Sequence, residues 1–336
     1  MRIVIVGAGA IGAVTAAYMA MAGVDVTLVC HRETAAENMR QEGLRITGKR
    51  GAHTVMLHTV SSVKALSGRY DCCLIATKAY DLFEAANSVL PYLAPEALVV
   101  ALQNGICIDL LIKAVGEERA AGAIVTWSCT MHADTHMELT GEGGFLLGMM
   151  RGGSDARLEP VQKMLSHMAP TELTENYLSA MFSKLIINSG ITCGGAMAGE
   201  TLGKMLLHPD ARRFFIEIVR EDLQIADAMG IPVPSFGGKL DYYKFIKGNG
   251  LWDRARRHIT LLIVGLRYRR LRSSSLTSLL RGGKTEVDTL NGWIAQKGAE
   301  LGVPTPVNSA VVRIIREIEA GSRAITPTNI AEALKA

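Results

Sequence analysis

Three polar residues recur at helical spacing on an apolar segment near the middle of the chain. Lys184, Asn188 and Thr192 fall four residues apart, so a helix would place them on one face. An ammonium aligned with an amide and a hydroxyl can bind a substrate oxygen, and a lysine can also donate a proton. A solvent-facing stripe on an amphipathic helix explains the same spacing without chemistry. Both interpretations remain open from these residues alone.

A glycine-rich turn near the N-terminus has the spacing that binding of a dinucleotide requires. Three glycines follow a β-branched run at residues 2–6 and precede an alanine-rich helix at residues 11–22. The first allows a tight turn, the second lets backbone approach a pyrophosphate, and the third lets the helix pack closely on the strand. The helix N-terminus adds free N–H groups and a positive dipole end. The predicted cofactor-binding residues here are Gly7, Ala8, Gly9, Ala10, Ile11 and Gly12.

The residues after the second predicted strand, at 25–30, indicate which nucleotide is bound. Folds that bind NAD place an acidic residue there to accept the ribose 2′-hydroxyl, whereas this chain has His31 and Arg32. A cation suits a 2′-phosphate, so we expect NADPH. The adjacent Glu33 could accept the hydroxyl instead and keeps NADH as the alternative.

The same N-terminal residues could also be a secretory signal. Arg2, an apolar run and Ala20-Met21-Ala22, with small residues on either side of the methionine, fit that pattern. The spaced glycines and the second strand favour the nucleotide fold. Six cysteines are scattered through apolar contexts without a C-x-x-C pair. That usage indicates reduced thiols, and we expect a cytoplasmic protein.

Predicted strands and helices alternate through the first half of the chain, which predicts a parallel sheet covered on both faces. Lys78 and Asn104 follow two of the strands, at the edge of such a sheet where ligands bind. The predicted strands span residues 44–47, 53–58, 70–77, 97–102, 123–130, 137–140 and 145–149, and the predicted helices span 35–42, 81–93 and 156–168.

Beyond Pro170 the pattern is helical almost throughout. The predicted helices span residues 176–191, 211–229, 252–271, 286–301 and 308–320. The expected architecture is therefore α/β, with an N-terminal Rossmann-type doubly wound parallel sheet and an all-α C-terminal domain. We expect an NADP-binding Rossmann-like domain at 1–172 and an α-helical substrate and catalytic domain at 173–336.

The charge is local. Seven arginines from Arg254 to Arg272 exceed the whole net charge of +4, so the rest of the chain sums to −3 and nucleic acid is not an expected partner. We expect this stretch to be a helix half buried against its own domain or a second subunit, which makes a homodimer possible.

The apolar run at 259–266 is too short to cross a bilayer, so no membrane partner is expected. His132 and His136 lack suitably spaced partners, and no metal is expected.

The chain resembles the ketopantoate reductase (2-dehydropantoate 2-reductase) family over nearly its full length. The features that carry the resemblance are the opening glycines, Lys78 after its strand, Gln103-Asn104-Gly105, the segment from Lys184 to Asn188, and Ser273-Ser274 followed by Thr285-Glu286-Val287-Asp288 and Asn291-Gly292. The serines could alternatively cap a helix. The family joins a Rossmann domain to an all-helical domain and reduces a 2-keto acid with NADPH.

The resemblance also implies roles for single residues. It implies Lys184 as the general acid, Asn188 and Ser274 as substrate contacts, with Thr192 beside them, and Lys78, Asn104 and Glu286 around the cofactor and active site. The expected reaction is the reduction of ketopantoate to pantoate, on the route to pantothenate and coenzyme A.

Three departures from the family pattern bear mainly on the substrate. Thr192 stands where the family has a second asparagine, with Cys193-Gly194-Gly195 after it, and Ser278 stands where the family has an aspartate. The arginine-rich stretch is also unlike the family. A family member that reduces another 2-keto acid, or a non-catalytic NADP(H)-binding sensor, are therefore the alternatives.

Overall fold

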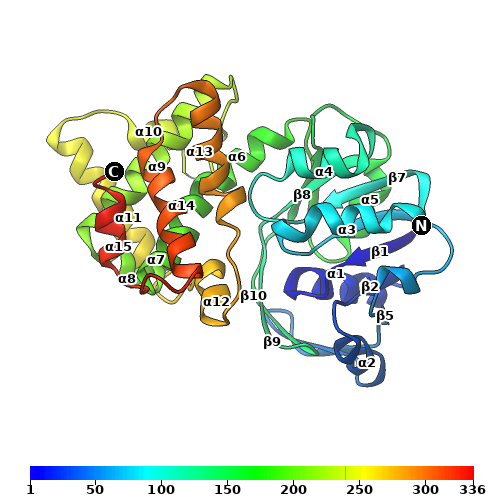
Figure 1. Cartoon of the computed structure of the whole chain (residues 1–336). Coiled ribbons are helices and arrows are strands. Elements are labelled where there is room, and N and C mark those ends of the chain that lie inside the picture. The colour runs from blue at the N-terminus through cyan, green and yellow to red at the C-terminus, as the bar shows by residue number, and fades with distance from the viewer. Residues whose placement is uncertain (239) are drawn as a thin grey trace. The chain divides into compact units, whose positions relative to one another are not determined.

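The computed structural model describes residues 1–238 and 240–336, which form two compact units. The N-terminal unit contains residues 1–103 and 107–178, and the C-terminal unit contains residues 104–106 and 179–336. The first is built around a mostly parallel sheet and the second is helical (Figure 1). The predicted fold class is therefore confirmed.

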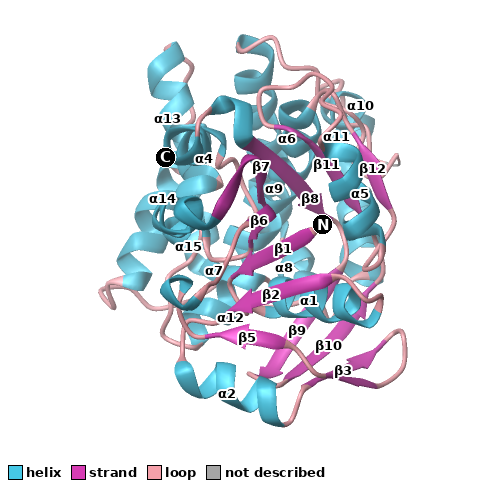
Figure 2. Ribbon diagram, turned by 90° about the vertical axis from the view of Figure 1, so that its right-hand side faces the viewer, coloured by secondary structure: helices cyan, strands magenta, loops and turns pink. Residues whose placement is uncertain are grey.

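The large sheet of the N-terminal unit has the strand order β12-β11-β8-β7-β6-β1-β2-β5. In Figure 2 it runs from β12 at the upper right across to β7 and then down to β5. All neighbours pair in parallel except β11 and β8. The central strands are apolar on both faces because helices cover both. The strands are β1 (Arg2–Val6), β2 (Asp25–Val29), β5 (His58–Val60), β6 (Tyr70–Ile75), β7 (Leu93–Ala101), β8 (Ala120–Val125), β11 (Phe145–Met149) and β12 (Thr171–Leu173).

The helices of this unit are short and pack on the sheet. They are α1 (Ala10–Met21), α2 (Glu33–Gln41), α3 (Leu82–Val89), α4 (Ile108–Val115) and α5 (Leu158–Ser166). The α1 helix is rich in alanine, and Ala13, Val14 and Ala17 are fully buried against the strands. Small side chains there let the helix lie close to β1, as the glycine spacing requires.

A second, four-stranded sheet was not predicted. It has the order β4-β3-β10-β9 and contains β3 (Leu44–Gly48), β4 (His53–Val55), β9 (Ser128–Ala133) and β10 (His136–Gly141). The predicted single strands at 53–58 and 123–130 are therefore wrong, since each is two strands in different sheets. Two residues outside both sheets, the exposed Met56 and the buried Leu57, separate β4 from β5. Periodicity alone does not show such a change of partner.

The C-terminal unit consists of helices around α9, which lies beside α14 in Figure 1. They are α6 (Tyr177–Asn188), α7 (Gly194–Ala198), α8 (Leu202–Leu207), α9 (Pro209–Ala228), α10 (Tyr242–Ile246), α11 (Leu251–Arg267), α12 (Ser274–Leu280), α13 (Asn291–Leu301), α14 (Pro306–Glu319) and α15 (Thr328–Ala333). A π turn at Ser189–Cys193 joins α6 to α7, so the helical backbone predicted at 176–191 continues beyond residue 191 but changes its helix type after Asn188. The predicted helix at 286–301 begins only at Asn291, because Val287–Thr289 is a 3₁₀ turn.

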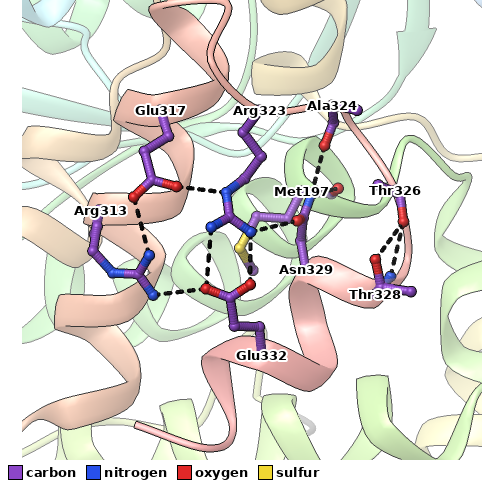
Figure 3. A network of polar contacts seen from close by, with 9 residues as sticks. All are labelled: Met197, Arg313, Glu317, Arg323, Ala324, Thr326, Thr328, Asn329 and Glu332. Carbon is purple, nitrogen blue, oxygen red and sulfur yellow. Dashed lines mark hydrogen bonds and ion pairs between the residues drawn. The ribbon is translucent and has the colours of Figure 1, made fainter.

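The last helix is held to the rest of the unit by the polar network in Figure 3. Arg323 donates to Glu317 on α14 at 2.6 Å and to Glu332 on α15 at 2.7 Å. The buried Asn329 donates from its side-chain nitrogen to the Met197 carbonyl on α7 at 3.1 Å. The C-terminal helix is therefore tied to the segment that follows the π turn.

Candidate active site

The N-terminal glycine turn has the geometry that a pyrophosphate needs. Gly7 has a φ of +112°, and a Cβ added there would lie 2.7 Å from the backbone of Ala76 and Thr77. A Cβ at Gly12 would lie 2.0 Å from the Gly7 carbonyl oxygen. At Gly9 an added Cβ would meet nothing within 4 Å, so the space beside its backbone is open. Gly7 and Gly12 thus allow close packing of the backbone, whereas Gly9 borders open space.

The residues around that open space suit an anion. Gly9 is the N-cap of α1, it supplies no side-chain cap, and the first turn of the helix has no acidic residue. The N–H groups of that turn are therefore available, together with the positive end of the helix dipole. Ala8, Ala10 and Ile11 are partly exposed on the same turn. The residues present fit a dinucleotide.

The end of β2 carries a cation that already has a partner. His31 and Arg32 are exposed, and the Arg32 guanidinium forms an ion pair with Asp134, in the turn between β9 and β10. Glu33 pairs instead with Arg40, whose Nη2 lies 3.1 Å from its Oε1. Hydrogen bonds from Ser61 and from Arg40 lower the pKa of Glu33. Asp134 was not predicted, because it lies about a hundred residues from Arg32 in the sequence.

The ends of β6 and β7 are held together by one side chain. The buried Gln103 donates from Nε2 to the carbonyl oxygens of Ile75, at 3.0 Å, and Thr77, at 3.1 Å. Lys78 follows directly and is partly exposed. These two bonds fix the end of β6 and the residues after it, from which Lys78 projects.

Asn104 and Lys184 meet within the C-terminal unit. Lys184 Nζ donates to Asn104 Oδ1 at 2.8 Å. The backbone after Asn104 is held by Thr289, whose carbonyl oxygen accepts from the Ile106 N–H at 2.9 Å. Gly105 has a φ of +82°, and a Cβ there would lie 2.3 Å from the Thr289 carbonyl oxygen. The glycine is therefore required for this close approach.

The environment of Lys184 tunes its acidity. Burial lowers the pKa of Lys184 to about 8, and the charge of Glu286 opposes that shift. Glu286 is itself buried, and the preceding Thr285 is fixed because its N–H and its hydroxyl both donate to Glu319 Oε1 at 2.7 Å. A lysine with this pKa is protonated at neutral pH and yet releases its proton readily.

The polar stripe lies on one partly exposed face of the helical segment. Lys184, Asn188 and Thr192 share that face with Ile187 and Ile191, and all five are partly exposed. The intervening residues 185, 186, 189, 190 and 193 are buried. The π turn keeps Thr192 on this face even though α6 ends at Asn188.

The serines divide into a structural and an exposed one. The Ser273 hydroxyl accepts from the Leu276 N–H at 3.1 Å and caps α12, as the structural interpretation expects. Ser274 is exposed in the first turn of the same helix. A Cβ at Gly195 would lie 2.9 Å from Ser273 Oγ, so one glycine of the Cys193-Gly194-Gly195 departure makes room for this cap.

A buried polar network behind the lysine helix was also missed. Glu221 on α9 accepts from the Val307 and Asn308 N–H groups, at 2.8 and 2.9 Å, and so caps α14. The Asn308 side chain donates to Asp222 Oδ1 at 3.1 Å and accepts from Asn291 at 2.8 Å. Burial raises the pKa of Asp222 well above its usual range.

The network reaches the π turn through Ser189. The Ser189 hydroxyl lies near Asp222 and lowers its pKa, although the contact lacks the full geometry of a hydrogen bond. Asp222 and Asn308 thus connect Ser189, which follows Asn188, with Asn291 at the start of α13. Such residues look like ordinary polar positions in a sequence, because their partners are far away along the chain.

The remaining polar features have local partners. His132 Nε2 lies 2.7 Å from Glu138 Oε2, His136 Nε2 lies 3.0 Å from Thr47 Oγ1, and the described residues contain no group of three or more His, Cys, Asp or Glu side chains that could hold a metal ion. Arg256 and Arg257 donate to backbone carbonyls of α10 and of the loop that follows it, and Arg257 is buried. Within the described ranges, no helix is long and apolar enough to cross a membrane.

The fold and the glycine turn define a protein of the dinucleotide-binding Rossmann class with a helical second unit. The sequence profile of ketopantoate reductase PanE/ApbA matches residues 3–152, and the profile of its C-terminal part matches residues 176–319. These matches cover most of the chain. The protein therefore belongs to the ketopantoate reductase family, as its residues predicted.

Individual relatives are distant but span the whole chain. The chain is 26% identical to 2-dehydropantoate 2-reductase of Halobacterium salinarum, over 94% of this chain and 98% of the relative. It is 28% identical to the enzyme of the same name from Pyrococcus horikoshii, over 95% of this chain and 98% of the relative.

Solved structures share the same fold. A PanE/ApbA family ketopantoate reductase from Ralstonia eutropha JMP134 is 25% identical, with a TM-score of 0.81 and coverage of 96% of this chain and 100% of that chain. A D-mandelate dehydrogenase solved with NADH and anilino(oxo)acetate has the same TM-score and coverage at 20% identity. At that identity the second likeness shows the fold alone.

Proposed function

We propose that this protein reduces a 2-keto acid with NADPH, and that ketopantoate, reduced to pantoate for pantothenate and coenzyme A, is the leading substrate. Residues 1–172 bind the nucleotide and residues 173–336 bind the substrate. The observation that carries the proposal is the 2.8 Å hydrogen bond from the Lys184 ammonium to Asn104 Oδ1, and the lowered pKa of Lys184, about 8, supports it. A proton donor poised in this way suits reduction of a ketone.

The proton transfer follows from how charge develops on the substrate. When bound at the glycine turn of residues 7–12, NADPH would supply a hydride for the carbonyl carbon of the substrate. Negative charge would then grow on the carbonyl oxygen. The Lys184 ammonium stabilises that charge and donates its proton to the oxygen. Asn104 orients the ammonium through its 2.8 Å bond. Glu286 supports the charged form of Lys184 before the transfer.

The other predicted residues take their roles from their exposure and chemistry. Asn188 and Thr192 lie on the exposed face beside Lys184 and contact the substrate, and the exposed Ser274 hydroxyl binds its carboxylate. Glycines 7, 9 and 12 receive the pyrophosphate with residues 8, 10 and 11. His31 and Arg32 receive the 2′-phosphate, and Lys78, Asn104 and Glu286 lie around the cofactor.

The substrate tail is the part that the family alone does not define. Thr192 offers a hydroxyl and a methyl group where an asparagine would offer an amide, and Ile187 and Ile191 flank it. We expect weaker selection for the hydroxyl of ketopantoate than the family norm, which keeps a different 2-keto acid as the alternative. The D-mandelate dehydrogenase of the same fold was solved with anilino(oxo)acetate, a bulkier compound.

The site is proposed to work in the cytoplasm without a membrane or nucleic-acid partner. The structure pairs none of the six cysteines in a disulfide, and five of them are buried. A homodimer through α11 is compatible with its exposed Trp252, Ile259 and Ile263. Sedimentation analysis of the purified protein reports its oligomeric state.

NADPH oxidation by the purified protein with a panel of 2-keto acids tests the proposed activity. We expect turnover with at least one acid, loss of turnover in Lys184→Ala, and retention in the matched control Lys204→Ala, a lysine on α8 that is also in the C-terminal unit. Tight NADPH binding without turnover of any acid would instead support the non-catalytic sensor and overturn the proposal.

A further inference from the structure

The turn between β9 and β10 holds an acidic residue in a fixed position. Ala133 pairs with His136 in the antiparallel register, so Asp134 and Thr135 form a two-residue turn. The Thr135 carbonyl accepts from the Arg45 N–H at 2.8 Å, and β10 pairs along β3. Backbone hydrogen bonds hold β10 on both sides, to β9 and to β3. The position of Asp134 at the tip of this hairpin is therefore fixed.

Asp134 reaches the end of β2, where the nucleotide ribose is expected. Its Oδ1 accepts from the Arg32 guanidinium in an ion pair. Its charge also raises the pKa of the Cys30 thiol, after the larger effect of burial. Arg32 and Cys30, both at the end of β2, therefore both interact with the Asp134 carboxylate, which places that carboxylate beside the end of the strand. The Asp134 side chain is only 27% exposed, so its charge is less screened than a fully hydrated one.

Glu33, the acidic residue that the sequence offers for this place, has partners elsewhere. Its carboxylate lies 3.1 Å from Arg40, and hydrogen bonding by Ser61 and Arg40 lowers its pKa. Asp134 instead pairs with the arginine that a 2′-phosphate needs. The carboxylate that bears on nucleotide choice is therefore the one on the hairpin.

We propose that Asp134 is a specificity-determining residue for the nucleotide, because it occupies Arg32 and competes with the 2′-phosphate of NADPH. The inference rests on the proposed use of NADPH. A guanidinium binds phosphate best when two of its N–H groups donate to it in parallel, so a phosphate must displace or share the Asp134 contact. The carboxylate also repels the phosphate directly. A ribose 2′-hydroxyl, by contrast, can donate to a carboxylate. Asp134 thus weakens the binding of NADPH and favours the binding of NADH.

Dissociation constants of the full chain for NADPH and NADH, measured by fluorescence titration without substrate, test the inference. In Asp134→Asn we expect NADPH to bind about fivefold more tightly or better, on the scale of one exposed ion pair. NADH binding should stay unchanged or weaken. The matched control is Glu138→Gln, which removes the same charge from the same hairpin at a carboxylate paired with His132. This control should leave the ratio of the two constants within roughly twofold of native.

A second variant shows whether the effect passes through Arg32. In an Arg32→Gln background, the gain from Asp134→Asn should fall to roughly twofold or less. The inference is overturned if Asp134→Asn changes the NADPH to NADH ratio no more than Glu138→Gln does. If native protein prefers NADH, the proposed use of NADPH fails. A shift toward NADPH in Asp134→Asn would still support the role of Asp134.

Discussion

Lys184 Nζ lies 2.8 Å from Asn104 Oδ1, although the two residues are 80 positions apart in the chain. Asn104 comes directly after Gln103, which holds the end of β6, and Lys184 comes from α6. The first two residues after Asn104 pack on Thr289, close to Glu286. Within the C-terminal unit, Lys184 on α6 is thus bonded to Asn104, and the residues after Asn104 are held by the 3₁₀ turn that contains Thr289. This arrangement is the basis for assigning Lys184 the role of proton donor.

Replacing Lys184 by methionine separates its chemical role from its structural cost. Lys184→Met should lower kcat by about 10²–10⁴, the usual range for a general acid. The folded state lowers the pKa of this lysine, so its charged form is costly to bury at neutral pH. The melting temperature of the variant should therefore equal or exceed that of native protein. Near-native kcat in a folded variant would remove Lys184 from the mechanism.

The pH dependence of kcat should report the same group. Lys184 donates a proton, so only its protonated form is active, and kcat should fall as the pH rises through the folded pKa of about 8. The free energy of unfolding should instead rise with pH between pH 8 and the ordinary lysine pKa. In that range the unfolded chain binds more protons at this lysine than the folded chain does. Initial rates from pH 6 to 10 test the first expectation. A rate that stays flat to pH 10 would contradict it.

Two glycines in the N-terminal turn should respond differently to alanine. Gly12→Ala places a Cβ 2.0 Å from the Gly7 carbonyl oxygen and should lower the free energy of unfolding by about 1–3 kcal/mol. Gly9→Ala meets no neighbour within 4 Å and should leave stability within about 0.5 kcal/mol of native. Its methyl group enters the open space, so NADPH should bind about tenfold more weakly. Urea denaturation and nucleotide titration distinguish the two effects, and unchanged NADPH affinity in Gly9→Ala would place the pyrophosphate elsewhere.

Much of the fold was accessible from the sequence because its signals are local. The glycine spacing, the apolar strands and the helical periodicity each depend on residues that are close in the chain. The strands at 53–58 and 123–130 were wrong because a continuous run of β-forming residues does not reveal where it changes sheets. The π turn after Asn188 was missed for a related reason, since it interrupts a helix without a proline or any other breaking signal.

The site was predictable only where a motif marked it. The family features singled out Lys184, Asn104 and Glu286, and the structure brings Lys184 and Asn104 into contact. Asp134 and Asp222 carry no motif, and their importance lies in partners more than 80 residues away. A single sequence does not contain that pairing, because it arises from the register of the hairpin and from helix packing.

Asp222 offers a test of the network behind the lysine helix. Its pKa is raised by burial, so an amide should replace the neutral acid well. Asp222→Ala should lose about 1–3 kcal/mol of stability, because Asn308 loses a buried partner, whereas Asp222→Asn should lose less. A raised carboxyl pKa makes native stability fall as the pH rises from the unfolded toward the folded pKa, so Asp222→Asn should gain on native protein from pH 5 to pH 8. Urea denaturation at both pH values checks this, and equal losses in both variants with no effect of pH would refute it.

The most direct measurement of the central claim compares kcat/KM for ketopantoate and 2-ketoisovalerate, with NADPH, in the native protein. The two acids differ by one hydroxymethyl group, so the comparison isolates recognition of the substrate tail. The proposed function predicts that ketopantoate is preferred by at least ~10-fold, equivalent to about 1.4 kcal/mol of transition-state binding. Equal values, or a preference for 2-ketoisovalerate, would contradict ketopantoate as the substrate.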